Sequence, residues 1–293
     1  MISVGVPTYN EEKVIGNCIS SILKQISKKD EVIVVASGCT DRTAEFVKNI
    51  SKKDKRVKLL VEKERKGKAS ALNLILKKAK GEIIVQTDGD VTLEDGAVKN
   101  LIKHFSDRKI GAVSGNPVPI IPKNNLFYEW TIMSYKKASS LRIKETREGD
   151  FWHLSGYLCA FRKKSLDEVP FAKGAVDAWM GKLILEKGYK LIYEPDAKVF
   201  VKTPTTIRDF VNQKARVRAG YFFLARGKGK SPRKMKSEFS YFFPELSKIP
   251  LKRWPAFFIS AFIYTYSWLR GWYLYKSNKS LNQIWKHIET TKK

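Results

Sequence analysis

Acidic residues and cysteines are scarce in this chain of 293 residues, and both shortages limit what the protein can be. The three cysteines, Cys18, Cys39 and Cys159, are too few and too scattered for a disulfide framework or a zinc site, so we expect a reducing compartment. Against 56 basic residues stand only 29 acidic ones, which gives a formal net charge of +27. Such a charge requires an acidic partner: nucleic acid, an anionic membrane face or a phosphorylated substrate.

The first residues also lack the features of a signal peptide. The segment from Met1 to Pro7 has neither a basic start nor a long apolar stretch, and it enters a strand at once. We therefore expect the catalytic part to stay in the cytoplasm. With 43% hydrophobic and 29% charged residues the chain is globular, and its length suits one large domain plus an appendage.

Short apolar strands alternate with longer helices through residues 1–90. We expect strands over 2–6, 31–35, 57–61 and 83–85, the first ended by Pro7, with a first helix capped by Asn10-Glu11-Glu12. This alternation predicts βαβ units, and therefore an α/β fold with a mostly parallel sheet flanked by helices. In such sheets ligands bind outside the carboxyl ends of the strands.

Two carboxylates stand at one of these ends, in Asp88-Gly89-Asp90. Alternation along an extended chain points Asp88 and Asp90 to the same side, and Gly89 lets a large anion approach the backbone. Paired carboxylates suit Mg²⁺ or Mn²⁺ held together with substrate phosphates. A polar turn that merely closes the strand is the alternative.

Four segments follow one another in the first half of the chain: Val6–Glu12, Ser37–Thr43, Lys66–Asn73 and Asp88–Asp90. In this order they resemble the P-x-Y-N-E loop, the D-G-S-T-D-x-T turn, the G-K-x-x-A-L-N segment and the D-x-D motif of the family 2 glycosyltransferases, enzymes of the GT-A fold that use a nucleotide-sugar donor. The resemblance covers roughly residues 1–220. It implies donor binding by Pro7, Tyr9, Glu11, Lys66 and Asp88, and metal binding by Asp88 and Asp90.

Three more segments extend the resemblance into the second half. Ser155 and Gly156 resemble the small-residue strand beside donor sugar and acceptor, and Asp177 matches the Asp that takes the proton from an acceptor hydroxyl. Gln213 and Arg216 resemble the Q-x-x-R-W motif, in which the arginine would clamp the leaving pyrophosphate.

The chain departs from the family pattern at a few positions. Ala36 and Ser37 stand where two aspartates are common, which leaves the nucleotide base open. Val176 replaces the Glu that precedes Asp177, and Val217 replaces the Trp of an acceptor platform, which argues against a processive synthase.

Several of these residues also have purely structural interpretations. Asp41 and Asp177 could be helix N-caps, of which we favour the cap for Asp41 and the site for Asp177. Asn10 and Glu11 could complement a helix dipole, Lys66 and Lys68 could be solvated, and Gly156 could form a strand bulge. Arg218, more than Arg216, fits a basic helix face turned to solvent or lipid headgroups.

The composition changes after residue 225. We expect a catalytic domain over 1–225, a basic linker over 226–253, an aromatic helix over 254–275 and a basic tail over 276–293. The aromatic segment could just span a bilayer, but the basic residues beyond it favour a membrane-associated helix that lies in, or re-enters, the cytoplasmic leaflet. A buried helical hairpin of a soluble protein is the alternative.

Together these features predict an inverting, metal-dependent glycosyltransferase at the cytoplasmic face of the cell membrane. Its partners would be a nucleotide-sugar donor, a lipid-linked or glycan acceptor and an anionic membrane surface, with no nucleic acid. Two other hypotheses remain: a catalytically inactive transferase-like scaffold, and a basic nucleic-acid-binding protein with steeply salt-dependent affinity.

Overall fold

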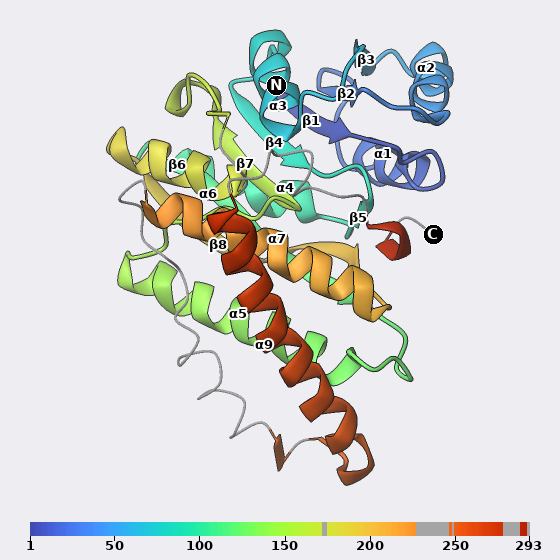
Figure 1. The fold of residues 1–293 in the computed structure, drawn as a ribbon. Helices are drawn as coiled ribbons and strands as arrows, with labels where there is room; N and C mark the ends of the chain where they lie inside the picture. Colours follow the sequence, from blue (N-terminus) through green and yellow to red (C-terminus); the bar gives the residue numbers. More distant parts are fainter. Residues whose placement is uncertain (172–174, 227–245, 248, 278–287, 292–293) are drawn as a thin grey trace.

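The computed structural model describes residues 1–171, 175–226, 246–247, 249–277 and 288–291. The fold is α/β, with one twisted β-sheet at its centre (Figure 1). Eight strands pair in the order β3-β2-β1-β4-β7-β6-β8-β5. The strands are β1 (Ile2–Thr8), β2 (Glu31–Ser37), β3 (Val57–Glu62), β4 (Ile83–Thr87), β5 (Val91–Leu93), β6 (Ile110–Ile120), β7 (Leu158–Arg162) and β8 (Lys190–Lys202).

The first half of the sheet has the predicted parallel arrangement. β1 pairs in parallel with both β2 and β4, and β2 pairs in parallel with β3. β1 does not end at Pro7 as expected but continues to Thr8. The proline is accommodated because β1 and β4 pair only as far as Gly5 and Gln86, so Pro7 faces a partner strand on the β2 side alone.

The second half of the sheet is mixed, where the sequence predicted a mostly parallel sheet. β7 lies antiparallel between β4 and β6, β5 is antiparallel to β8, and β6 and β8 are parallel. β6 continues to Ile120, through the polar segment Ser114-Gly115-Asn116 and Pro117. The pairing of β6 with β8 shifts register between Ser114 and Asn116, so the strand continues past an unpaired residue. The side-chain amide of Asn116 donates a hydrogen bond to the Pro195 carbonyl at 2.9 Å.

Helices cover both faces of the sheet, each on its own apolar cluster. α1, α2 and α4 pack on one face, and α3 and α6 on the other. The bounds are α1 (Ile15–Leu23), α2 (Thr43–Lys53), α3 (Lys68–Lys78), α4 (Ala97–Ile102), α5 (Tyr128–Glu148), α6 (Val176–Glu186), α7 (Ile207–Arg226) and α9 (Trp254–Lys276), with short 3₁₀ turns η1 (Lys103–Ser106), η2 (Lys163–Ser165), η4 (Leu251–Arg253) and η5 (Glu289–Thr291).

The start of α1 differs from the predicted cap. Asn10-Glu11-Glu12 does not cap the helix, which begins at Ile15 without a side-chain cap. Instead the Glu11 carbonyl accepts the amides of Val14 and Ile15 in a turn, and Asn10, at a positive φ of 52°, exchanges hydrogen bonds with Thr40. In this turn Asn10 and Glu11 form hydrogen bonds with the residues before and at the start of α2.

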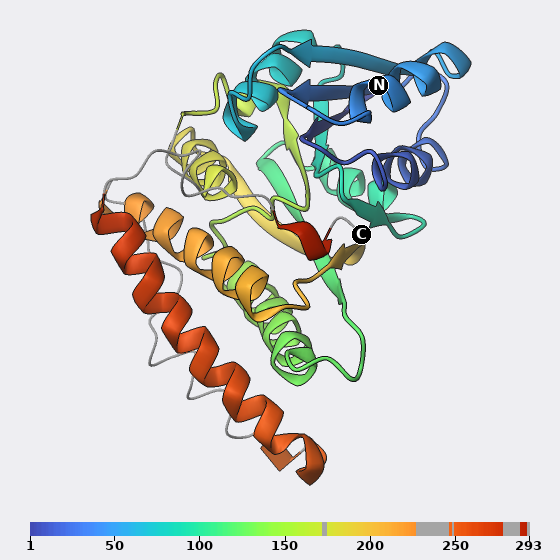
Figure 2. The ribbon, with the colours of Figure 1, turned by 45° about the vertical axis from the view of Figure 1, so that its right-hand side comes forward.

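Three long helices, α5, α7 and α9, form a layer beside the sheet, with α9 alongside α7 (Figures 1 and 2). The rings of Phe127 and Phe210 stack with centroids 4.0 Å apart, and Trp130 packs against Tyr264 of α9 at 5.0 Å. At residues 254–275 the predicted helix is therefore present and packed on the domain. Among the helices that the structure describes, none is both long and apolar enough to cross a membrane.

The predicted basic linker and tail fall largely outside the described residues. Of the tail, η5 is described and docks on α7, where the amide and hydroxyl of Thr290 both donate to Asp209 at 3.0 and 2.8 Å.

Candidate active site

Three predicted site regions meet around the side chain of Lys68, the first residue of α3. Its Nζ lies 2.7 Å from Oδ1 of Asp88, which directly follows β4, and 3.3 Å from Oδ1 of Asp177 in the first turn of α6. Asp88 and Asp177 are 89 positions apart in the sequence, yet they share one ammonium group. The sheet thus brings the predicted metal carboxylate and the predicted base to one place.

Gly156 lies directly beneath Asp177. A Cβ at this position would overlap the Asp177 carboxylate, and its Cγ would be only 2.7 Å away. The Gly156 carbonyl accepts hydrogen bonds from Lys68 at 3.1 Å and Gln86 at 2.9 Å, while the buried Ser155 donates its amide to Ser114 Oγ at 3.0 Å. The residue precedes β7, so close approach of Asp177, and not a strand bulge, explains the glycine.

Asp177 is not the N-cap of α6. Ala175 holds that position, with a positive φ of 51°, and Asp177 is the second residue of the helix. The N-cap favoured for Asp41 is also wrong, because Arg42 holds that position in α2 and no side chain caps the helix. The Asp41 carboxylate, one residue earlier, accepts the Thr43 amide at 3.0 Å and the Glu12 amide at 3.1 Å, and so connects the start of α2 to the loop after β1.

Glu11 supports the Asp88–Asp90 loop from the side of β1. Its buried carboxylate accepts a hydrogen bond from Thr8 Oγ1 at 2.6 Å, and its amide donates to Thr43 Oγ1 at 2.7 Å. A side chain at Gly89 would overlap Glu11, so the glycine is needed for this close contact. Glu11 is thus a neighbour of the acidic loop and not only a residue of a helix start.

The remaining predicted donor residues of the first half lie around this loop with different exposure. Pro7 is buried in β1, and Tyr9 is half-buried with the guanidinium of Arg65 4.1 Å above its ring. Lys66 is exposed, and its backbone amide donates to Ser37 Oγ at 3.3 Å. Lys68, for which the sequence left a solvated side chain open, is the lysine of this segment whose ammonium lies among the carboxylates.

The carboxylates of Asp88, Asp90 and Asp177 outnumber the single ammonium group of Lys68 between them. Burial raises the pKa of Asp88 to about 6, with the charges of Asp90 and Asp177 adding to the shift and Lys68 opposing it. For Lys68 burial lowers the pKa, but the charges of Asp177 and Asp88 outweigh burial and raise it. The Cys18 thiol, which donates to the Asp88 carbonyl at 3.4 Å, has its pKa raised by burial and by nearby carboxylates. The arrangement favours additional positive charge.

The predicted residues Gln213 and Arg216 lie in α7. Gln213 is buried, and burial lowers the pKa of Arg216, an effect opposed by Tyr157, Asp90 and Asp88. Arg216 is therefore within electrostatic reach of the acidic loop.

Arg218 is not the solvent-facing arginine that the sequence indicated. It is buried, and its guanidinium carbon lies 3.1 Å from the ring centroid of Trp268 in α9. Its backbone neighbour Val217 is exposed.

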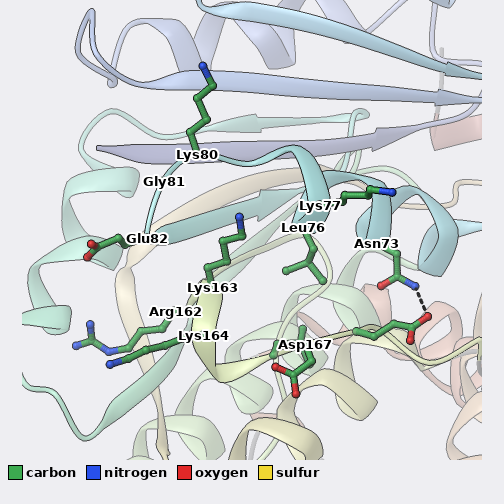
Figure 3. Close-up of a pocket in the computed structure, with 12 residues that line it drawn as sticks. Asn73, Leu76, Lys77, Lys80, Gly81, Glu82, Arg162, Lys163, Lys164 and Asp167 are labelled. Atoms are coloured by element: carbon green, nitrogen blue, oxygen red, sulfur yellow. Dashed lines mark hydrogen bonds between the residues drawn. The ribbon is translucent and has the colours of Figure 1, made fainter.

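A basic cavity elsewhere does not belong to this site. It measures about 860 Å³ and lies before the start of β4 and after the end of β7, the opposite end of these strands from Asp88 (Figure 3). Lys163 there donates to the Ala79 carbonyl at 2.6 Å, and Arg162 donates to the Phe105 carbonyl at 2.7 Å. These cations hold backbone groups in place, and Lys77 and Lys80 point in different directions.

Within the described ranges, no group of three or more His, Cys, Asp or Glu side chains is arranged to hold a metal ion. Asp88 and Asp90 form a pair and not a complete ligand set.

Comparison with known proteins agrees with this geometry. Residues 3–170 match the family model described as "Glycosyl transferase family 2". The chain belongs to this family. The matched range includes Asp88, Asp90 and Gly156 but ends before Asp177 and Arg216. The fold brings both residues to the matched range, because Asp177 forms an ion pair with Lys68 and Arg216 is within electrostatic reach of Asp88 and Asp90.

Curated relatives match about three quarters of the chain. It is 28% identical over 227 residues to a poly-beta-1,6-N-acetyl-D-glucosamine synthase of Staphylococcus aureus, covering 74% of this chain and 54% of the synthase. The corresponding synthase of Staphylococcus epidermidis is 28% identical over 234 residues, covering 77% and 56%. The chain thus spans about half the length of these family members.

Solved structures show the same fold. A mannosyltransferase from Pyrobaculum calidifontis, in complex with GDP-Man and Mn2+, superimposes with a TM-score of 0.72 at 24% identity, covering 95% of this chain and 88% of the other. Staphylococcus aureus TarS 1-349, in complex with UDP-GlcNAc, gives a TM-score of 0.55 at 17% identity, covering 91% and 81%. This family member therefore has a GT-A-like fold.

Proposed function

We propose that the protein is an inverting glycosyltransferase that moves a sugar from a nucleotide-diphosphate-sugar to an acceptor hydroxyl or phosphate. One observation carries the proposal: Asp88 and Asp177 approach the same Lys68 ammonium, at 2.7 and 3.3 Å. Family membership and the nucleotide-sugar complexes of structural neighbours support a donor of this class.

Asp177 would act as the general base. It would take the proton from the acceptor hydroxyl as that oxygen attacks the anomeric carbon, and the bond to the diphosphate breaks in the same displacement. One displacement inverts the anomeric configuration. If the acceptor is a phosphate, its low pKa makes a base unnecessary, and Asp177 would position it.

The other site residues would bind donor and acceptor. Arg216, with Gln213 one helical turn before it, would stabilise the departing nucleoside diphosphate. Ser155 and Gly156 would line the acceptor side. Pro7, Tyr9, Glu11 and Lys66 would contact the nucleotide.

Asp88 and Asp90 fit a divalent ion, Mg²⁺ or Mn²⁺. Such an ion is commonly held by one or two carboxylates plus substrate phosphates. Burial raises the pKa of Asp88 to about 6, and the charges of Asp90 and Asp177 add to this shift. When bound, the ion would neutralise the donor diphosphate.

The variant Asp177→Asn tests the assignment of the base. We expect transfer to fall by about 10²-fold or more, with donor affinity nearly unchanged, because only proton removal is lost. A sugar-transfer assay measures the loss of activity, and calorimetry with the donor measures its affinity separately. Asp167→Asn, at a carboxylate whose side chain is 83% exposed, is the matched control. Near-normal turnover of Asp177→Asn would show that the base is another group.

An inactive scaffold is the second candidate, favoured by Ala36, Val176 and Val217 at positions where the family differs. Donor hydrolysis measured with Mn²⁺ and then with EDTA separates the two. Metal-dependent hydrolysis supports the enzyme, and its absence for every nucleotide sugar supports the scaffold.

We also propose that α9 places the enzyme on the cytoplasmic face of an anionic membrane, next to a lipid-linked or glycan acceptor. Its buried positions include Ser260, Ser267 and Gly271, whereas large apolar side chains point outwards. We call these exposed residues the outer stripe: Phe258, Ile259, Phe262, Tyr266, Leu269, Trp272 and Tyr273.

The inner side of α9 is apolar as well, with Phe257 buried and Tyr264 packed on the same cluster, whereas an ordinary surface helix is polar on its outer side. The net charge of +27 complements an anionic lipid surface.

A further inference from the structure

Lys68 is held at the centre of the site by acceptors from three separate segments. It donates hydrogen bonds to Asp88 at 2.7 Å and to the Gly156 carbonyl at 3.1 Å, and it forms an ion pair with Asp177 at 3.3 Å. Two hydrogen bonds and one ion pair thus surround the ammonium group. The side chain is 27% exposed, so it is reachable from solvent but ordered by its partners.

The backbone fixes where Lys68 begins. Gly67 has a positive φ of 90°, and α3 starts at the next residue. The buried residues Ala69, Leu72 and Ile75 anchor α3 on the sheet. The position of the ammonium therefore follows from the packing of a whole helix.

Lys68 and a divalent ion would compete for the same carboxylate. Asp88 belongs to the pair that fits the metal, and its Oδ1 atom is occupied by the ammonium. A metal bound at Asp88 would have to share the carboxylate with the Lys68 ammonium, and the repulsion between the two positive charges opposes this.

We propose that Lys68 is a positioning residue that takes the place of the divalent ion in the donor-free protein. It holds Asp177 beside the acidic loop, and it releases Asp88 when metal and donor arrive together. The inference rests on the proposed function for the presence of a metal. Its consequence is that Lys68 weakens metal binding in the absence of donor.

Mn²⁺ titration of the donor-free protein, followed by electron paramagnetic resonance of the free ion, tests this. We expect Lys68→Met to bind Mn²⁺ between about twofold and tenfold more tightly than the unaltered protein, because a competing ion pair is removed. Lys63→Met removes the same charge from an exposed lysine five residues earlier and is expected to leave Mn²⁺ affinity unchanged. Lys68→Gln, which keeps hydrogen-bond donors without the charge, should behave like Lys68→Met and serves if the latter does not fold.

The proposal is overturned if both folded Lys68 variants bind Mn²⁺ no more tightly than the unaltered protein. It is also overturned if Lys63→Met gains as much Mn²⁺ affinity as Lys68→Met. The readout needs no turnover, so it is separate from the test of the base. Tighter binding in Lys68→Met together with an active Asp177→Asn would retain this inference and reject only the role of Asp177.

Discussion

Gly156 packs so closely against Asp177 that one methyl group there would displace the candidate base. A Cβ there would overlap the Asp177 carboxylate, which is the movable end of a side chain and can shift aside. We therefore expect Gly156→Ala to fold normally but to lose about 10- to 100-fold in kcat, since small displacements of a catalytic group are costly. Steady-state transfer kinetics and thermal unfolding measure both.

Gly16→Ala is the matched control for this variant. Gly16 lies inside α1, and a Cβ there would meet nothing within 4 Å. Activity should not change, and the free energy of unfolding should rise by about 0.5–1 kcal/mol because alanine favours the helix. Wild-type kcat in Gly156→Ala would contradict the contact between this glycine and a working base.

The two lysines beside Gly67 show which residue-level features a sequence can reveal. The pattern Lys66-Gly67-Lys68 indicates that one lysine points at the site, but the choice depends on the φ of Gly67 and on where α3 begins. Asp88 and Asp177 were predictable because their types and positions match a family pattern. Arg218 was not, because its partner Trp268 lies fifty residues away.

Among the secondary-structure elements, the strands of the first half are joined by one buried carboxylate. Glu31 opens β2 and accepts hydrogen bonds from Ser3 Oγ and the Lys80 amide, each at 2.7 Å, and from Lys58. Burial alone would raise its pKa, but the hydrogen bonds of Lys58, Ser3 and Lys80 outweigh burial, so the pKa is lowered from 4.5. Glu31 thereby connects β1, β3 and the segment before β4.

We expect Glu31→Ala to lose about 2–3 kcal/mol of unfolding free energy at neutral pH, because the Ser3 hydroxyl and the Lys80 amide lose their buried acceptor, whereas the ion pair with the 44% exposed Lys58 contributes little. The folded pKa is below the unfolded one, so this stabilisation is present above pH 4.5 and is lost as the pH falls through the folded pKa. Urea unfolding at several pH values should show the difference narrowing in acid. Glu64→Ala, at an exposed position, should change little at any pH. A constant difference across this range would show that the charge of Glu31 is unimportant.

The elements themselves were predicted unequally. The parallel strands β1 to β4 follow from apolar runs separated by helices, a local pattern. The direction of β7 and the full lengths of β6 and β8 do not follow from a local pattern. They depend on partner strands distant in sequence and on a bulge that lets Gly115 and Pro195 lie within strands. The helix at 254–275 was predicted, but its contacts with α5 and α7 were not.

On the scale of the whole molecule, charge and exposed apolar surface point to the same kind of partner. The chain carries a net charge of +27, and the outer stripe of α9 exposes large apolar side chains along the helix. A nucleic-acid-binding protein would use the charge without the stripe. A protein on an anionic membrane would use both, since electrostatic attraction and apolar burial add.

The double variant Phe262→Ser/Leu269→Ser separates these two possibilities. The two side chains are 76% and 64% exposed. We expect it to bind vesicles containing anionic lipid at least about 10-fold more weakly, because burying each side chain in lipid contributes about 1.5–3 kcal/mol. Co-flotation with anionic and with neutral vesicles, at low and high salt, measures the contributions of charge and stripe.

Phe46→Ser/Val61→Ser provides the matched control, because these side chains are 42% and 59% exposed and lie in α2 and β3, away from α9. This control should bind vesicles like the unaltered protein, and both double variants should keep their folded circular dichroism spectrum. Equal vesicle binding by all three proteins, or salt-sensitive binding to DNA with no binding to vesicles, would reject the membrane role of α9. The first result would leave charge alone as the means of attachment, and the second would return nucleic acid as the partner that balances the charge.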